Sequence, residues 1–491
     1  MTATGLLVAG TSSDAGKSLV TTGICRFLAR QGVRVAPFKA QNMSNNSMVC
    51  ADGAEIGRAQ YLQAQAARAI PESAMNPVLL KPGSDRRSFV VVRGQPAGVL
   101  DAGEFASGRR HLAEAAFAAY AELAERYDVI VSEGAGSPAE INLRAGDYVN
   151  MGLAQRFSLP VVVVGDIDRG GVFASLYGTV ALLDDADRAL IRGLVINKFR
   201  GDVGLLRPGL DRITELTGVP VLGVLPWLGG VWLDGEDTLQ VGRWGTDLAD
   251  LAVTDGAAAV RVAVIRFPRL SNATDVDALA CEPGVQVTMT TDPVALRSAD
   301  VVVLPGSRST VADLEWLRRT GLADAVLDAA TRGVAVLGIC GGYQMLGRSI
   351  DDEVESSAGT VPGLGLLPTS VTFGQAKVLR RTIGDWRGKD VAGYEIHHGI
   401  ASVDGGVEPF LDGCRAGSVW GTMWHGAFEN DGFRRAWLAS ATTGSGRAFR
   451  PADGALGFAD RREAMIDRLA DAVAEHLDTD AVLALLAARR T

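Results

Sequence analysis

Short runs of valine, isoleucine and leucine recur along this chain, and segments with helical spacing separate them. We expect strands at residues 6–9, 33–38, 127–131, 160–164, 193–197 and 219–225. Near-continuous apolar residues indicate strands buried on both faces, which is typical of a mainly parallel sheet with helices on either side. A second series follows at residues 262–265, 285–289, 300–304, 334–337 and 419–424. The sequence therefore predicts an α/β fold with two sheets.

A weakening of this pattern divides the chain. Around residues 242–259, glycine, aspartate and alanine replace the apolar runs, which indicates a connection between domains. A chain of 491 residues is long enough for two or three domains, each with its own core. We expect a first domain over residues 1–245, a linker over 246–260, a second domain over 261–450 and a C-terminal helical extension over 451–491.

The composition narrows the class of protein. Hydrophobic residues make up 47% and charged residues 21% of the chain, as in an ordinary globular protein. The longest apolar stretches are strand-sized and no basic leader begins the chain, so we expect a cytoplasmic protein without a membrane span. A net charge of −9 disfavours nucleic acid as the main partner, and five cysteines without metal-ligand spacing favour neither a disulfide scaffold nor a zinc site. These features leave the oligomeric state open.

A glycine- and serine-rich loop follows the first expected strand. The run GTSSDAGKS occupies residues 10–18, and apolar residues then recur at helical spacing up to Gly32. In known nucleotide-binding proteins, a glycine-rich loop of this kind between a strand and a helix points successive backbone N–H groups at a phosphate chain. Five residues, rather than the four of the standard motif, separate the two outer glycines. We expect a nucleoside triphosphate to be bound by Gly10, Thr11, Asp14, Gly16, Lys17 and Ser18.

Polar residues follow other expected strands of the first domain. Glu133 precedes Gly-Ala-Gly, and Lys39 and Asn197 each end a strand. Ligands gather beyond the carboxyl ends of parallel strands, so these side chains are expected near the phosphates. Glu133 and Ser18 could hold Mg²⁺, Lys39 could stabilise the transferred phosphoryl group, and Asn197 could bind the nucleotide base.

Amide side chains are dense in residues 41–47. So many amides suit hydrogen bonds to a large polar substrate, or the ordering of a lid over the site. We expect substrate or phosphate contacts from Gln41, Asn42, Ser44 and Asn45.

Cys340 ends an apolar run that stops at a thiol and two glycines and then resumes with helical spacing. This pattern predicts a buried strand, a sharp turn and a helix, with the thiol on the turn. The first N–H groups of the helix would favour a thiolate there. A buried cysteine usually packs as a small hydrophobic group, but that role does not require the surrounding glycines. We therefore predict that Cys340 is a nucleophile.

A cysteine nucleophile needs a base, and the chain has five histidines, at 111, 397, 398, 425 and 476. His425 ends an apolar run and precedes a glycine, so it is the best candidate. His397 and His398 are alternatives. The turn at Gly306 and Ser307 follows another strand and could offer a backbone N–H to an oxyanion, or it could be a plain turn. Together these features predict acyl transfer through a thioester.

These motifs resemble known families. The run GICGGYQ (residues 338–344) with a C-terminal histidine resembles class I glutamine amidotransferases. The loop at 10–18 with SEGAG (residues 132–136) resembles the dethiobiotin synthetase type of carboxylate-activating domain. In this order in one chain, the two resemble the cobyrinate amidase family. Further segments resemble one branch of that family, at residues 38–47, 55–60, 166–171, 197–202, 304–316 and 393–397.

The resemblance implies a ligase that uses ATP, Mg²⁺ and glutamine to amidate the b, d, e and g carboxylates of a corrinoid, adenosylcobyrinic acid a,c-diamide. It also implies that Cys340 and His425 release ammonia from glutamine, and that Gly341, Tyr343 and Gln344 belong to the glutamine or oxyanion site. Rival interpretations are the branch that amidates the a and c carboxylates, another glutamine-dependent ligase, or a P-loop ATPase switch with an inactive amidotransferase module.

One position departs from the wider amidotransferase pattern. The usual third member of the triad is a glutamate two residues after the histidine, where this chain has Ala427. Glu429 lies two residues further on, so the sequence leaves open whether any carboxylate orients His425. A thiolate is already a strong nucleophile, so the loss of an orienting group should cost less than in a serine enzyme.

Overall fold

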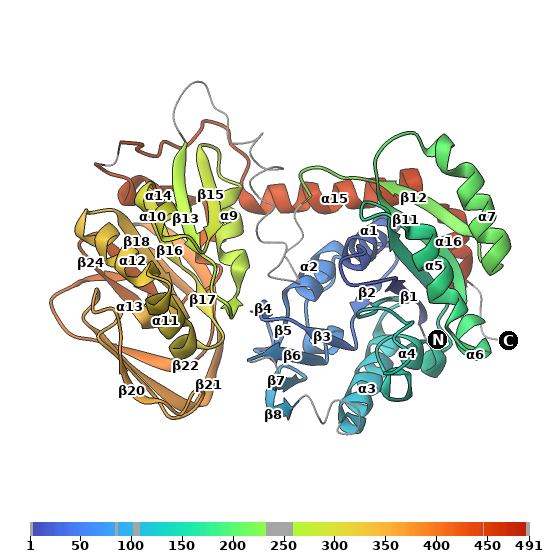
Figure 1. The fold of residues 1–491 in the computed structure, drawn as a ribbon, viewed down its shortest axis with the longest axis horizontal. Coiled ribbons are helices and arrows are strands. Elements are labelled where there is room, and N and C mark those ends of the chain that lie inside the picture. Colours follow the sequence, from blue (N-terminus) through green and yellow to red (C-terminus); the bar gives the residue numbers. More distant parts are fainter. Residues whose placement is uncertain (1–2, 84–86, 102–108, 232–258, 445, 488–491) are drawn as a thin grey trace.

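The computed structural model describes residues 3–83, 87–101, 109–231, 259–444 and 446–487. Within these ranges it has two α/β lobes, and a long helix near the C-terminus runs from one to the other (Figure 1). The predicted two-domain α/β fold is confirmed. Residues 246–258 of the expected linker lie outside the described residues.

The first lobe is built on a parallel sheet. Its strand order is β12-β11-β10-β1-β9-β2, and every neighbouring pair is parallel. The strands are β1 (Thr4–Gly10), β2 (Val35–Phe38), β9 (Val129–Glu133), β10 (Val161–Asp166), β11 (Ile191–Phe199) and β12 (Val221–Pro226). Consecutive residues of β1, such as Leu6, Leu7 and Val8, are fully buried because apolar clusters cover both faces of the sheet.

Helices flank this sheet (Figure 1). They are α1 (Lys17–Arg30), α2 (Arg58–Ala66), α3 (Arg110–Arg126), α4 (Met151–Phe157), α5 (Val172–Ala181), α6 (Asp185–Arg188) and α7 (Arg207–Thr217). Helix α1 starts directly after the glycine-rich loop, so its first N–H groups face the carboxyl end of β1.

Short strands that the apolar pattern did not predict form the side of the first lobe that faces the second lobe (Figure 1). A four-stranded sheet contains β3 (Gln41–Met43), β6 (Val78–Pro82), β7 (Arg87–Val92) and β8 (Gln95–Asp101). A separate antiparallel hairpin contains β4 (Ser47–Val49) and β5 (Glu55–Gly57). The amide-rich segment 41–47 therefore runs through ordered strands at the boundary between the lobes.

The second lobe has a mixed sheet of order β15-β13-β16-β18-β25-β24-β23, in which the first five strands are parallel. The strands are β13 (Val260–Ile265), β15 (Val285–Thr290), β16 (Val301–Leu304), β18 (Ala335–Ile339), β23 (Glu408–Phe410), β24 (Gly413–Ala416) and β25 (Val419–Thr422). Its helices are α9 (Asp277–Ala280), α10 (Pro293–Arg297), α11 (Thr310–Arg319), α12 (Leu322–Thr331), α13 (Gly341–Leu346) and α14 (Asp431–Ala441).

Smaller elements complete the second lobe. Strand β14 (Leu270–Ser271) pairs with β17 (Gly306–Ser307), and the 3-10 turns η6 (Ala273–Val276) and η7 (Ala427–Glu429) follow β14 and β25. A further sheet contains β19 (Ser349–Asp352), β20 (Gly359–Pro362), β21 (Thr369–Trp386) and β22 (Lys389–Val403).

The C-terminal helices return to the first lobe. Helix α15 (Phe458–His476) packs on α1, where Arg26 forms ion pairs with Glu463 and Asp467. Helix α16 (Thr479–Ala487) follows it, and its apolar side chains join the core on one face of the first sheet. In the part of the chain that the structure describes, no helix is long and apolar enough to cross a membrane.

Two candidate active sites

Cys340 lies between β18 and α13 in a backbone conformation that residues other than glycine rarely adopt. Its φ is 49° and its ψ is −109°, and such a conformation costs about 1–3 kcal/mol. A hydrogen bond from the Cys340 N–H to the Thr422 carbonyl, at 2.8 Å, holds the turn against β25. The following helix passes so close to β16 that a Cβ on Gly342 would lie 1.9 Å from the Leu304 carbonyl oxygen. The strand, turn and helix thus form as predicted, with the cysteine at the strained position.

His425 reaches this turn from the end of the neighbouring strand, β25, and its side chain lies close enough to Cys340 for the two charges to interact. The other side of the ring is held by a carboxylate, because His425 Nδ1 lies 2.7 Å from Asp275 Oδ2. Burial alone would lower the pKa of His425, but Asp275 and Cys340 outweigh it and raise the pKa to about 10. The imidazole therefore keeps its proton at neutral pH and can stabilise a thiolate beside it.

Asp275 is the carboxylate that orients His425, and the sequence pattern did not predict this role. It lies on η6, and its second oxygen accepts the Gly426 N–H at 2.8 Å, so it fixes both the ring and the backbone beyond it. Glu429 is instead engaged by Arg58 and by Arg462, the latter at 3.0 Å. The signal that could have pointed to Asp275 is the polar run after the strand at 260–265, by the same strand-end rule that selected Glu133.

The predicted oxyanion residues lie beside the thiol. A Cβ on Gly341 would lie 2.8 Å from the Ser307 nitrogen, and one on Gly306 would lie 3.1 Å from His425 Cε1. The structure therefore brings Gly306, Ser307 and Gly341 together around the cysteine–histidine pair. The Ser307 hydroxyl donates to Asp313 at 2.6 Å, and burial raises the pKa of that carboxyl to about 6.

The other two residues of this group are placed differently. The Gln344 amide oxygen accepts a hydrogen bond from Thr310 at 2.9 Å, on the first helical turn after Cys340. Tyr343 points into the apolar core, where its hydroxyl lies 4.0 Å from the Cys414 sulfur. Tyr343 thus packs beneath the turn rather than beside the thiol.

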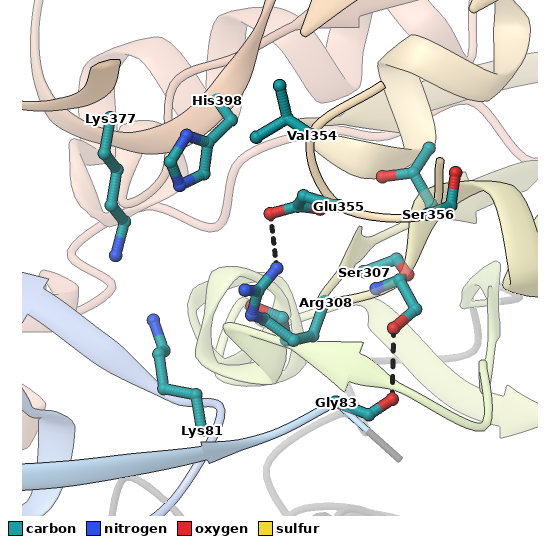
Figure 2. A network of polar contacts seen from close by, with 12 residues as sticks. Lys81, Gly83, Ser307, Arg308, Val354, Glu355, Ser356, Lys377 and His398 are labelled. Atoms are coloured by element: carbon teal, nitrogen blue, oxygen red, sulfur yellow. Dashed lines mark hydrogen bonds and ion pairs between the residues drawn. The ribbon is translucent and has the colours of Figure 1, made fainter. Parts of the chain in front are cut away.

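The alternative histidines have other partners. His397 Nε2 lies 3.1 Å from a Glu395 carboxylate oxygen, and His398 Nδ1 lies 3.1 Å from the Gly374 carbonyl. Figure 2 shows His398 with Lys377 at the boundary of the lobes, across from Lys81 of the first lobe. Both histidines are therefore engaged by other groups, and His425 is the histidine whose charge interacts with Cys340.

The candidate site of the first lobe centres on Glu133, which is fully buried at the end of β9. One of its oxygens accepts from the Ser18 hydroxyl at 2.9 Å and from the Lys39 ammonium at 2.9 Å, and the other accepts from the Gln63 amide. Glu133, Ser18 and Lys39 meet as predicted, whereas Gln63 is a further member from α2. A serine hydroxyl beside a carboxylate is a donor set that suits Mg²⁺.

The glycine-rich loop has the shape of a backbone cradle. Gly16 has a φ of 101°, and a Cβ there would lie 1.9 Å from Asn197 Nδ2, so only glycine fits. The Asn197 amide donates to the Ala15 carbonyl at 3.0 Å and thereby supports the loop from below. The Lys17 ammonium donates to the carbonyls of Ser12 and Gly136, at 2.9 and 3.1 Å, so it spans the mouth of the loop. These residues fit a polyphosphate.

The remaining loop residues lie at its edges. The Thr11 N–H donates to the Val164 carbonyl at 2.9 Å and ties the start of the loop, after Gly10, to β10. Asp14 has a positive φ of 60° and its carboxylate accepts from Arg169 at 3.2 Å.

The amide-rich residues are mostly used within the protein. Gln41 accepts hydrogen bonds from Arg109 at 2.8 Å and from Tyr148 at 2.6 Å, and Asn42 donates to Gln60 at 2.9 Å. Ser44 accepts from the Asn46 N–H at 3.0 Å, and Asn45 donates to the Pro82 carbonyl at 3.3 Å. The structure therefore spreads these residues along β3 and the loop between β3 and β4, where they order the segment.

Comparison with known proteins agrees with this two-site architecture. Residues 6–238 match the family model of the CobQ/CobB/MinD/ParA nucleotide binding domain, and residues 261–433 match that of the CobB/CobQ-like glutamine amidotransferase domain. The fold and its sites therefore define a glutamine amidotransferase joined to a nucleotide-binding domain.

Full-length relatives narrow the class. A cobyric acid synthase from Cutibacterium acnes is 63% identical over 98% of this chain and 100% of its own length. Cobyric acid synthases from Streptomyces avermitilis and Mycolicibacterium gilvum are each 58% identical, over 98% of this chain and 96% of their own length. The chain belongs to the cobyric acid synthase family, and it is an enzyme.

Proposed function

We propose that this enzyme converts adenosylcobyrinic acid a,c-diamide to cobyric acid in cobalamin biosynthesis, by amidating the b, d, e and g carboxylates with ATP and glutamine. The observation that carries the proposal is the presence, in one chain, of a buried Cys340–His425–Asp275 array and a phosphate cradle ending at Ser18 and Glu133. The names of the full-length relatives support the choice of substrate.

The second lobe would release ammonia. The Cys340 thiolate attacks the side-chain amide carbon of glutamine, and the carbonyl π pair moves to oxygen, where the N–H groups near Ser307 and Gly341 stabilise the oxyanion. His425 gives its proton to the leaving nitrogen, the C–N bond breaks, and a thioester remains. Water, deprotonated by His425, then hydrolyses the thioester to glutamate and restores the thiolate.

The first lobe would activate the acceptor. A substrate carboxylate oxygen attacks the γ-phosphorus of ATP, ADP leaves, and an acyl phosphate forms. Lys17 and Lys39 stabilise the negative charge on the phosphates. Ser18 and Glu133 would hold Mg²⁺, which when bound neutralises phosphate charge. Ammonia then attacks the acyl carbon, the C–N bond forms, inorganic phosphate leaves with the oxygen, and the nitrogen gives up one proton to the phosphate. Activation is required because a carboxylate is otherwise inert to ammonia.

Product mass tests the proposal directly. The full-length enzyme is incubated with adenosylcobyrinic acid a,c-diamide, ATP, Mg²⁺ and glutamine labelled with ¹⁵N in the side-chain amide. We expect four labelled amides in the final product. Amidation only of a precursor that lacks the a and c amides would identify the other branch of the family. Hydrolysis of ATP without any amide would favour the ATPase switch.

A further inference from the structure

One stretch of the first lobe, residues 39–63, touches both candidate sites. We refer to it as the bridging segment. Its two ends meet at one carboxylate, because Lys39 and Gln63 both bond Glu133. Between these ends, the chain passes through the hairpin of β4 and β5 on the side of the first lobe that faces the second (Figure 1). Because both ends of the bridging segment are bonded to the buried Glu133, its middle can hold residues of the second lobe in place.

The middle of the bridging segment exchanges hydrogen bonds with the second lobe. The Asn272 side-chain oxygen accepts the Ser47 N–H at 2.9 Å, and the Asn46 side-chain oxygen accepts the Ala273 N–H at 3.1 Å. Asn46 and Asn272 are 1% and 2% exposed, so water does not compete for these bonds. Each asparagine thus satisfies a backbone N–H of the opposite lobe, in a reciprocal pair that we call the amide clamp.

The amide clamp lies at the base of the turn that carries Asp275. Asn272 has a φ of 52° and precedes η6, and its carbonyl accepts the Asp275 N–H at 3.1 Å. The Asp275 carboxylate then holds the His425 ring. A shift of the turn at residues 272–273 would therefore move the group that orients the catalytic imidazole.

A second contact holds His425 from its other side. The backbones of His425 and Tyr394 form two hydrogen bonds, of 2.8 and 3.0 Å, and their rings stack at 5.5 Å. Tyr394 packs with Ile396 against Val49 of β4. The bridging segment thus supports both neighbours of His425, Asp275 and Tyr394.

We propose that Asn46 and Asn272 are positioning residues of the glutaminase: the amide clamp lets the synthetase lobe hold Asp275 where it orients His425. This proposal rests on the proposed function, because it assigns the clamp to the glutamine-hydrolysing step. The lobe that consumes ammonia would then form part of the machinery that releases it.

The test compares single variants of the full-length enzyme. Asn46→Ala removes the oxygen that accepts the Ala273 N–H. We expect kcat for glutamine hydrolysis to fall roughly fivefold, since one lost hydrogen bond is worth about 1 kcal/mol. The KM for glutamine should be unchanged, and so should amidation supported by added ammonium. Asn46→Asp keeps an acceptor oxygen and should recover most of kcat.

A matched control is Ser309→Ala, which also removes one hydrogen bond between the lobes, from the Ser309 hydroxyl to the Gly83 carbonyl at 3.3 Å. This bond does not involve the Asp275 turn, so kcat should stay at the wild-type value. If Asn46→Ala does not fold, Asn272→Gly removes the opposite acceptor, and glycine suits the positive φ there.

Three results would overturn the amide clamp: an unchanged kcat in Asn46→Ala, an equal loss of ammonium-supported amidation, or a kcat in Asn46→Asp as low as in Asn46→Ala. Failure of the proposed function looks different. In that case the wild-type enzyme itself shows no glutamine hydrolysis that depends on Cys340.

Discussion

The two candidate sites hold their reactive groups by different physical means. In the first lobe, the charge of Glu133 is neutralised by Lys39, and Ser18 donates a hydrogen bond to the same oxygen. In the second lobe, Cys340 is fixed by its backbone, at a φ of 49° that the tight turn imposes. A ligand that binds Glu133 must replace the hydrogen bonds from Lys39 and Ser18, whereas Cys340 already lies beside His425. We therefore expect the hydrogen bonds of Glu133 to rearrange when a ligand binds, and the turn at Cys340 to keep its geometry.

The buried carboxylates Glu133 and Asp275 differ in the same way, one with exchangeable partners and one with fixed partners. Glu133 faces groups that a phosphate or a metal ion would also engage, so its bonds are exchangeable. Asp275 faces His425 and the Gly426 N–H, so its bonds orient the histidine that we propose as the proton carrier. Substitutions that separate the two activities are the sharpest way to test this contrast.

The largest effect is expected from removal of the proposed nucleophile. Cys340→Ala should lower glutamine hydrolysis by on the order of 10⁵-fold, because nothing else can form the thioester. Amidation supported by ammonium should persist, because the first lobe is untouched. Release of glutamate and formation of product amide are the two measurements. Cys281→Ala, at another buried cysteine, is the control and should hydrolyse glutamine normally. Loss of ammonium-supported amidation in a folded Cys340→Ala variant would contradict the separation of the sites.

A smaller effect in the opposite lobe is expected from Glu133→Gln. We expect amidation to fall about 10²–10³-fold with either glutamine or ammonium, because the charged group that we propose as a ligand of Mg²⁺, and that orders Lys39, is lost. Glutamine hydrolysis without corrinoid should change little. Product formed with each nitrogen source is the measurement. Equal amidation rates in the variant and the wild type would remove Glu133 from the proposed site.

Asp275→Asn should reduce glutamine hydrolysis about 100-fold, less than the roughly 10⁴-fold loss typical of serine triads, because a thiolate is the better nucleophile. It should also change the pH profile. Burial lowers the pKa of His425, whereas Asp275 and Cys340 together raise it to about 10, so the variant without the Asp275 charge should lose the imidazolium at lower pH. The alkaline limb of the rate profile should therefore move to lower pH. Asp277→Asn, two residues on, should leave that limb in place.

Glu429→Gln should affect stability rather than the glutaminase rate. Its carboxylate pairs with Arg58 and Arg462, which are almost fully buried, so loss of the charge should cost about 2–4 kcal/mol of unfolding free energy. Burial raises the pKa of Glu429, but the two arginines outweigh it and lower the pKa to about 2. The wild-type contribution is thus present above the ordinary carboxyl pKa and is lost as pH falls through about 2. Denaturant unfolding at neutral pH is the measurement. A hundredfold loss of kcat would instead give Glu429 the role that we assign to Asp275.

Much of the fold followed from local patterns. Strands such as β1 and β18 were predictable because runs of apolar residues must be buried on both faces. The hairpin of β4 and β5 and the long pair of β21 and β22 were not predicted. Their residues alternate or are polar, and their pairing is decided by neighbours rather than by burial of a run.

The same limit applies to the candidate sites. Cys340, Ser18 and Glu133 could be selected because each stands at the end of an apolar run, where ligands gather in α/β sheets. Gln41 and Asn42 were selected for their amides, but the structure uses those amides to order the chain. Composition indicates that a segment is rich in hydrogen-bonding groups, but it does not say which partners those groups find.

What the sequence determined by itself was local: the strained turn at Cys340 and the glycine cradle before Lys17. These depend on backbone sterics over a few neighbouring residues, so they are encoded where they occur. Only the tertiary structure decided that Asp275 orients His425, since the two are 150 residues apart, and that Asn46 and Asn272 meet across the lobes. Such pairings depend on how distant segments pack, and packing is a property of the whole chain.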